Sequence, residues 1–222
     1  MSFLGIIPFR LCTASPDEVI GVTMTFPVRF VFSVILIVSA CLASGCTFPT
    51  KINDRLSYAT EKQFVVQYQA TPPISFEIDK ATKEFEFTDT ASGFVGGGAY
   101  RQFPIGWTLS AYLEQAEKAA LRSDKGVPIT VGVHLSDCQL KYTNSGFGTG
   151  VDWVSISLMI DTTFPGDSAP RKLSLHREVD MPMEEMALMG GDDRALVRAM
   201  EGLVADYIAQ VVGEAKTVAQ RK

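Results

Sequence analysis

The sequence predicts an α+β fold: an antiparallel sheet, built from a three-stranded meander and further N-terminal strands, with two amphipathic helices packed on one face. Two observations lead to this prediction. Between residues 129 and 179 apolar and polar residues alternate, as in half-buried strands. Two other segments, 109–122 and 192–213, repeat their apolar residues at helical spacing. Because each element has one apolar side, helices that cover a sheet would bury all of them.

The first strands are expected ahead of the first helix. Short apolar runs over Phe64–Tyr68 and Ile74–Ile78 are separated by two prolines, and Phe85–Thr88 alternates. The first helix is predicted over Leu109–Arg122, with Thr108 as its N-cap. Trp107 and Tyr112 are placed to contact each other across this helix start.

The meander follows, with strands over 129–142, 154–161 and 173–179 joined by turns. Within the first of these strands the alternation slips by one residue, which predicts a β-bulge near Asp137. The last helix begins after Asp192 or Asp193 and is expected to end at Gly213. Residues 214–222 are predicted to be a flexible tail.

An uncharged apolar run after a basic residue marks the N-terminal part. Arg29 precedes residues 30–43, which carry no charge, and small residues then lead to Cys46. The run has 14 residues (43 − 30 + 1), fewer than the about 20 that a spanning helix needs. This order is typical of a secretory signal, and Met24 gives it a compact start. We therefore expect residues 1–23 to be a wrongly assigned start and 24–45 to be the signal peptide.

Residues 42–46, Leu-Ala-Ser-Gly-Cys, resemble the lipobox of bacterial lipoproteins. The resemblance implies that Cys46 becomes the first mature residue and carries acyl chains such as palmitate. Cys41 also fits the pattern, but Cys46 leaves the longer apolar run upstream. Neither cysteine is followed by the aspartate that retains enteric lipoproteins at the inner membrane, so the resemblance implies the periplasmic face of the outer membrane. A cleaved signal without lipid and an uncleaved anchor are the alternatives.

The rest of the chain is expected to hold a tether over 46–60 and a single periplasmic domain over 61–213. The formal net charge of the whole chain is −5, without a dense basic patch, which argues against nucleic acid as a partner. Of the four cysteines, Cys138 alone would remain thiol-bearing in the lipidated protein. We expect it to be buried and unreactive, and no internal disulfide can form.

No set of residues predicts catalysis. His134 and His176 are out of phase with the apolar positions of their strands, so both are expected on the polar face of the sheet. Ser155 and Ser157 share that face with His176, which leaves a hydrolase as an alternative. No zinc-ligand spacing and no nucleotide-binding loop is present. We expect no enzymatic activity, no bound metal and no cofactor.

Four of the eight methionines fall within nine residues, at Met181, Met183, Met186 and Met189. Thioethers are soft ligands that could hold Cu(I). Flexible methionine side chains also fill irregular gaps in a core or form an adaptable contact surface. Packing, contact with a partner or an apolar ligand, and copper binding are the three interpretations of this segment.

From about Trp107 to Val212 the order of helix, meander and helix is similar to small periplasmic lipoproteins that assist envelope transport. These include the lipopolysaccharide-assembly lipoprotein and the auxiliary lipoproteins of ABC-type lipid transporters. The resemblance implies a non-catalytic accessory or scaffold subunit of an envelope assembly or transport complex, with a membrane contact through the lipid and an envelope protein as partner. The alternative is a lipoprotein that binds a metal or an apolar ligand through Met181–Met189.

Overall fold

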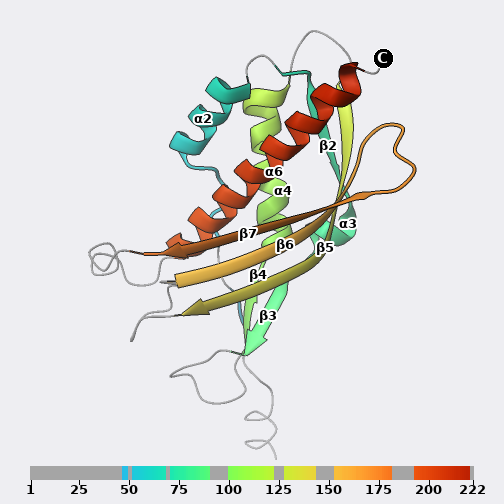
Figure 1. Cartoon of the computed structure of the whole chain (residues 1–222). Helices are drawn as coiled ribbons and strands as arrows, with labels where there is room; N and C mark the ends of the chain where they lie inside the picture. Colours follow the sequence, from blue (N-terminus) through green and yellow to red (C-terminus); the bar gives the residue numbers. More distant parts are fainter. Residues whose placement is uncertain are drawn as a thin grey trace, which may run out of the picture.

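A computed structural model of the chain describes residues 47–49, 52–68, 71–90, 100–122, 128–143, 153–181 and 193–220. Its fold is mixed α/β, with two sheets and helices packed together (Figure 1). The predicted signal peptide lies outside the described residues, as do Cys41 and Cys46. None of the helices described is long and apolar enough to cross a membrane.

The larger sheet has four strands in the order β2-β5-β6-β7. They are β2 (Ile74–Ile78), β5 (Ile129–Thr143), β6 (Trp153–Thr163) and β7 (Arg171–Asp180). The antiparallel meander β5-β6-β7 is confirmed. β2, however, pairs with β5 in parallel, so the sheet is mixed and the prediction of a fully antiparallel sheet is wrong. The physical reason is the crossover between β2 and β5, which includes a helix and returns the chain in its original direction.

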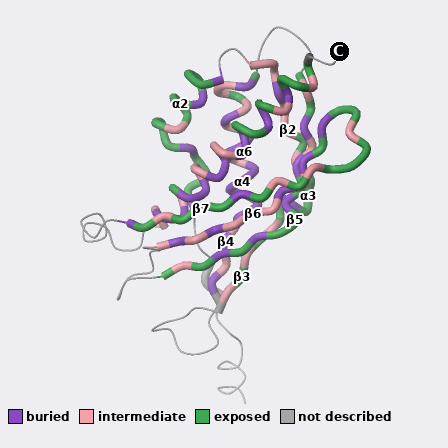
Figure 2. The backbone as a smooth tube through the Cα atoms, in the orientation of Figure 1, coloured by how far each residue is buried: buried purple, intermediate pink, exposed green. Residues whose placement is uncertain are grey.

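The predicted irregularity in β5 is confirmed. The register of β5 against β6 shifts between Leu135 and Asp137, so that Leu135 lies opposite Ile160 and Cys138 opposite Leu158. Without this bulge, the apolar residues that follow it would face away from the helices. Figure 2 shows the alternation of buried and exposed residues along these strands.

Two helices cover one face of the four-stranded sheet, as predicted (Figure 1). They are α4 (Ile105–Ala116), which continues into the π-helical turn η1 (Glu117–Leu121), and α6 (Arg194–Gln220). α4 begins four residues earlier than expected. Thr108 is therefore no cap but a buried residue inside the helix, where its hydroxyl donates to the Pro104 carbonyl at 3.0 Å. The predicted contact of Trp107 with Tyr112 is unsupported, since Trp107 is 58% exposed and Tyr112 is fully buried.

The last helix is longer than predicted. α6 continues through Gly213 to Gln220, and Ala215 on its last turns is fully buried. The flexible tail expected from residue 214 is therefore wrong up to residue 220. Two ion pairs fasten the helix to the edge strand β7, where Arg177 pairs with Asp206 at 2.7 Å and Arg171 pairs with Glu214.

A second, three-stranded sheet was not expected in this form. Its strands are β1 (Thr47–Pro49), β4 (Tyr100–Phe103) and β3 (Phe87–Thr90), in the order β1-β4-β3. β1 runs parallel to β4, with Thr47 opposite Tyr100, and β3 runs antiparallel to β4. β3 replaces the strand predicted over Phe85–Thr88.

The segment before β2 also differs from the prediction. Residues 58–68 form the helix α2 (Tyr58–Tyr68), although a strand was expected over Phe64–Tyr68. Phe64 and Tyr68, four residues apart, are its buried positions. The tether expected over 46–60 is also wrong in part, because Ile52 and Leu56 are buried in the core. A short helix, α3 (Lys80–Lys83), links β2 to the three-stranded sheet.

One continuous core joins both sheets and the helices. Its largest fully buried side chains come from α2, α4, α6 and the strands: Tyr112, Tyr207, Phe64, Phe103, Ile74, Leu113 and Ile156. Tyr207 of α6 satisfies its hydroxyl on the buried Thr162 of β6, at 3.0 Å. This core leaves the other face of the four-stranded sheet as a polar surface.

Candidate functional site

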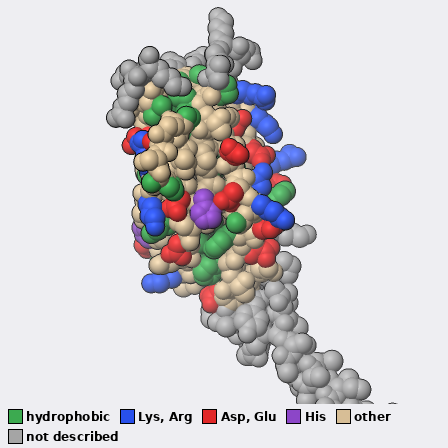
Figure 3. Space-filling view, turned by 90° about the vertical axis from the view of Figure 1, so that its right-hand side faces the viewer, with side chains coloured by type: hydrophobic (Ala, Val, Ile, Leu, Met, Phe, Trp, Pro, Cys, Tyr) green, Lys and Arg blue, Asp and Glu red, His purple; other side chains and the backbone are tan. Residues whose placement is uncertain are grey.

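The polar face of the four-stranded sheet carries both histidines, as the strand alternation predicted. His134 on β5 and His176 on β7 are exposed. Figure 3 shows, on one face of the molecule, a histidine side chain bordered by acidic side chains. Each histidine has a specific hydrogen-bond partner, so the two form separate small constellations.

The first constellation lies in a pocket of about 400 Å³ between β2, β5 and β6, which we call the sheet-face pocket. Asp79, the N-cap of α3, accepts a hydrogen bond from the Thr82 amide at 2.6 Å and contacts His134 Nδ1 at 2.5 Å. Burial alone would raise the pKa of Asp79, but the hydrogen bonds from Thr82 and His134 outweigh it and lower the pKa below its usual value. One carboxylate oxygen of Asp161 is buried there with no hydrogen-bond partner among the described residues.

The second constellation pairs β6 with β7. Ser157 Oγ lies 2.9 Å from His176 Nδ1, and the two residues face each other across the strands. The sequence-based hydrolase alternative named these residues together with Ser155, and the structure brings Ser157 and His176 into contact. Among the described residues no carboxylate is hydrogen-bonded to His176, so the arrangement is a pair and no triad. It lines neither the sheet-face pocket nor the pocket described next.

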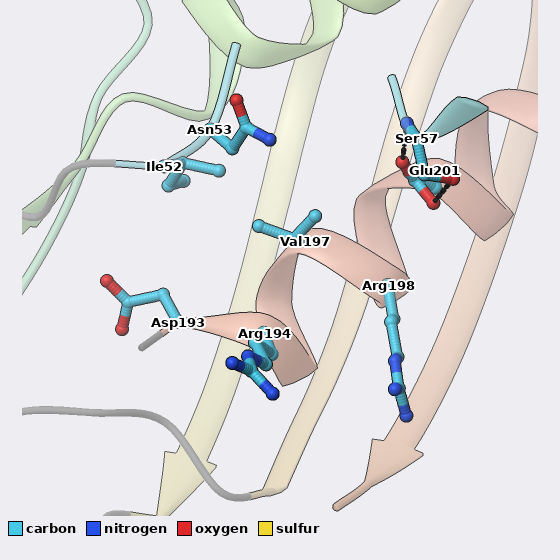
Figure 4. A pocket seen from close by; sticks show the side chains of 8 residues that line it. All are labelled: Ile52, Asn53, Ser57, Asp193, Arg194, Val197, Arg198 and Glu201. Carbon is cyan, nitrogen blue, oxygen red and sulfur yellow. Dashed lines mark hydrogen bonds between the residues drawn. The ribbon is translucent and has the colours of Figure 1, made fainter. Parts of the chain in front are cut away.

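A larger pocket of about 540 Å³ lies on the helix side of the domain, between the chain after β1 and the first turns of α6 (Figure 4). We call it the α6 pocket. Three of its residues come from the segment before α2 and five from α6 and the residue before it: Ile52, Asn53, Ser57, Asp193, Arg194, Val197, Arg198 and Glu201.

The acidic side chains of the α6 pocket are held by other groups. Glu201 accepts hydrogen bonds from the Ser57 hydroxyl and from the Thr60 hydroxyl, each at 3.0 Å. Asp193 forms an ion pair with Arg101 of β4 at 2.7 Å, and both side chains are nearly buried. These contacts tie α6 both to the start of α2 and to the three-stranded sheet.

Arg194 and Arg198 supply the positive charge of the α6 pocket. They are four residues apart on α6 and therefore lie on the same side of the helix. In Figure 4 both side chains project from that side, away from the hydrogen bonds between Ser57 and Glu201. A guanidinium group has five N–H donors in a planar fork that matches carboxylate and phosphate oxygens. This pair is the part of the pocket that is suited to an anionic group.

Cys138 is buried on β5, as predicted. Burial, and to a lesser extent the nearby Asp137 carboxylate, raises the pKa of its thiol to about 12. The thiol is therefore protonated at neutral pH, and this supports its interpretation as a small core residue.

The methionine segment is described only at its first member. Met181 is 5% exposed and belongs to the core, as the packing interpretation predicts. Met183, Met186 and Met189 lie outside the described residues, so partner contact and copper binding through them stay predictions. Within the described ranges, no group of three or more His, Cys, Asp or Glu side chains could hold a metal ion.

Sequence reasoning missed the α6 pocket. Its signal was present, since two arginines four residues apart at the start of an apolar-striped helix share one side of that helix. The contribution of Ile52, Asn53 and Ser57 could not have been found, because this segment was interpreted as a polar tether. The contact of Asp79 with His134 was missed too, since the two are 55 residues apart and meet only through the parallel pairing of β2 with β5.

No family model matches this chain, and no curated protein matches it significantly.

Proposed function

We propose that this protein is a lipid-anchored periplasmic lipoprotein, attached through Cys46 to the outer membrane, and a non-catalytic accessory or scaffold subunit of an envelope assembly or transport complex. The observation that carries this proposal is the run from Arg29 to Cys46. A basic residue, an uncharged apolar segment too short to span a bilayer and a small-residue ending before a cysteine are what lipoprotein processing requires.

The position of β1 supports an anchor at Cys46. The strand begins at Thr47, the next residue in the chain, and pairs with β4 over all three of its residues. A lipid on Cys46 would therefore hold the domain close to the membrane. One acyl chain gives only reversible membrane binding, so a stable anchor would need more than one chain on Cys46.

The accessory role draws on the order of elements. The succession α4, β5, β6, β7 and α6 is the one that suggested a resemblance to envelope lipoproteins. The polar face of its sheet carries paired side chains, such as Ser157 with His176. A second pair lies nearby, in which the indole nitrogen of Trp153 donates to the carboxylate of Glu178 at 2.9 Å. Such a face suits a polar protein contact, in which hydrogen bonds set the orientation of the partner.

Metabolic labelling with a clickable fatty acid tests the anchor. We expect label on the wild-type protein and on Cys41→Ala, and loss of label in Cys46→Ala. Cys41→Ala is a matched control, because it removes the neighbouring cysteine that also fits the pattern. Label that persists in Cys46→Ala, or an intact mass that still includes residues 1–45 without acyl chains, would contradict the proposal.

Affinity capture from detergent-solubilised membranes tests the accessory role. We expect the same envelope protein in repeated captures of the wild type, and a strongly reduced yield when the lipid anchor is removed by Cys46→Ala. Capture of the protein alone, from membranes in which the lipidated form is abundant, would count against an accessory subunit and leave the anchor itself untouched.

A further inference from the structure

We propose that Arg194 and Arg198 bind phosphate groups of anionic phospholipids, so that the side of the domain with the α6 pocket lies on the bilayer. This inference rests on the proposed function, because it takes Cys46 as the point of lipid attachment. It adds an orientation: α6 and the three-stranded sheet face the membrane, and the polar face of the four-stranded sheet faces away from it.

The first step is the reach of the chain. Ile52 lines the α6 pocket and follows Cys46 by six residues, which span at most about 20 Å when fully extended. β1 occupies half of that stretch and is paired with β4, so it cannot swing freely. A lipid on Cys46 thus keeps Ile52, at one side of the α6 pocket, within about 20 Å of the bilayer surface.

The second step is the connection between β4 and α6. Arg101 of β4 reaches Asp193, the residue directly before α6, at 2.7 Å, and its guanidinium lies over the rings of Phe103 and Tyr142. The strand beside the anchor and the start of α6 therefore form one connected unit. An anchor beside β1 positions the arginines of α6 together with that strand.

The third step is the chemistry of the pocket. The carboxylates of Glu201 and Asp193 are already engaged with Ser57, Thr60 and Arg101. Arg194 and Arg198 point to the other side (Figure 4). Because each guanidinium has five donors, it can bind a phosphate oxygen while it keeps other contacts. Arginine forms bidentate hydrogen bonds with phosphate groups, and the anionic lipid surface attracts nearby basic residues.

The opposite face offers a matched comparison. Lys141 of β5 and Lys172 of β7 are exposed and lie on the polar face of the sheet, because they are paired with Ser155 and Asp161 on the outward side of β6. Removing these two lysines changes the net charge as much as removing the two arginines. In the proposed orientation the lysines face away from the bilayer, so their loss should not affect docking.

The experiment uses the mature lipoprotein, purified and reconstituted into vesicles of phosphatidylcholine alone or with a third of phosphatidylglycerol. One fluorescent label is placed at Asn53→Cys, in the α6 pocket, and another at Lys172→Cys, on the polar face. The buried Cys138 thiol should not be labelled, since its pKa is raised to about 12. A headgroup-bound nitroxide lipid then quenches whichever label lies at the bilayer.

We expect the label at position 53 to be quenched more than the label at position 172, and the difference to increase in anionic vesicles. The double variant Arg194→Ser/Arg198→Ser should lower the ratio of docked to undocked orientations by about 30-fold in anionic vesicles. This factor follows because each basic residue near an anionic surface contributes about 1 kcal/mol to binding. Lys141→Ser/Lys172→Ser, read with the label at position 53, should leave this ratio unchanged.

The inference would be overturned by equal quenching of the two labels, or by an equal effect of the arginine and lysine variants. Both results count only for protein that floats with the vesicles. The proposed function fails differently: a protein whose intact mass lacks acyl chains does not float with the vesicles at all, and this result would remove both proposals. Flotation and intact mass are therefore measured on every variant before the quenching.

Discussion

The ion pair between Arg101 and Asp193 offers the most direct test of how the domain is held together. It joins β4 of the three-stranded sheet to the start of α6, with 2.7 Å between nitrogen and oxygen. The two side chains are only 11% and 9% exposed. Arg101→Met keeps most of the apolar stem. It removes the charge, together with the guanidinium that lies over the rings of Phe103 and Tyr142.

The expected loss follows from the burial. Removing one partner of a buried ion pair leaves the other charge without compensation and costs about 3–5 kcal/mol. Because Asp193 takes part in a further interaction and is 9% exposed, we expect the lower end, about 3 kcal/mol. For a domain of this size, in which the free energy of unfolding changes by about 2 kcal/mol per molar urea, the midpoint should fall by about 1.5 M.

Equilibrium unfolding in urea, followed by tryptophan fluorescence and far-UV circular dichroism on the purified full chain, measures this loss. Arg122→Met serves as the control, since Arg122 is exposed at the end of η1 and its replacement should change stability by less than about 0.5 kcal/mol. The reasoning is refuted if Arg101→Met loses no more than the control. In that case the pair would not connect β4 with α6 energetically.

Three further predictions concern single positions. Gly106→Ala should prevent stable folding, because the added Cβ would lie 1.7 Å from the Thr82 carbonyl oxygen. Gly213→Ala, where no atom of the described residues lies within 4 Å of the added Cβ, should raise the free energy of unfolding by about 0.5–1 kcal/mol. Urea titrations compare the two variants, and an equal effect would contradict the close approach at Gly106. Cys138, whose pKa is raised to about 12, should not react with a thiol reagent at pH 8 until urea unfolds the chain, and rapid labelling of the native protein would exclude its burial. The pKa of Asp79 is lowered from 3.8 in the folded protein. The stabilising effect of this carboxylate should therefore be complete above pH 3.8 and disappear as the pH falls through the lower folded value. Asp79→Asn should abolish this part of the acid dependence of stability, and an unchanged dependence would disprove the role of the carboxylate.

Strand alternation predicted the meander and its bulge well. The side chains of β5 and β6 alternate between a core face and an open face, and a period of two residues is unambiguous over strands this long. The slip at Asp137 could be read from the sequence for the same reason. The placement of both histidines on the open face followed from the same alternation.

The helix α2 was mistaken for a strand because a short apolar run does not distinguish the two periods. The run contains β-branched and aromatic residues, which strands favour: Phe64, Val65, Val66 and Tyr68. In the structure only Phe64 and Tyr68 are buried, four residues apart, while Val66 is 73% exposed. Tertiary packing, which the sequence of one segment does not contain, decided the outcome.

The parallel pairing of β2 with β5 could not be predicted, since strand neighbours distant in sequence are chosen by the whole fold. The three-stranded sheet was missed for a related reason: β1 and β4 are only three and four residues long, and β4 contains the charged Arg101. The extension of α6 was available in principle. Ala215 follows Val211 by four residues and continues the buried side, but Gly213 was given too much weight as a stop signal.

The parallel alignment of β1 with β4 determines how the domain responds to tension. A pull on the chain ahead of Thr47, directed along the strand, loads the three residue pairs of β1 and β4 simultaneously, in shear. A hairpin pulled from its open end would instead release its pairs one after another. Force at this end of the polypeptide is thus passed into β4, which the ion pair of Arg101 with Asp193 connects to the start of α6.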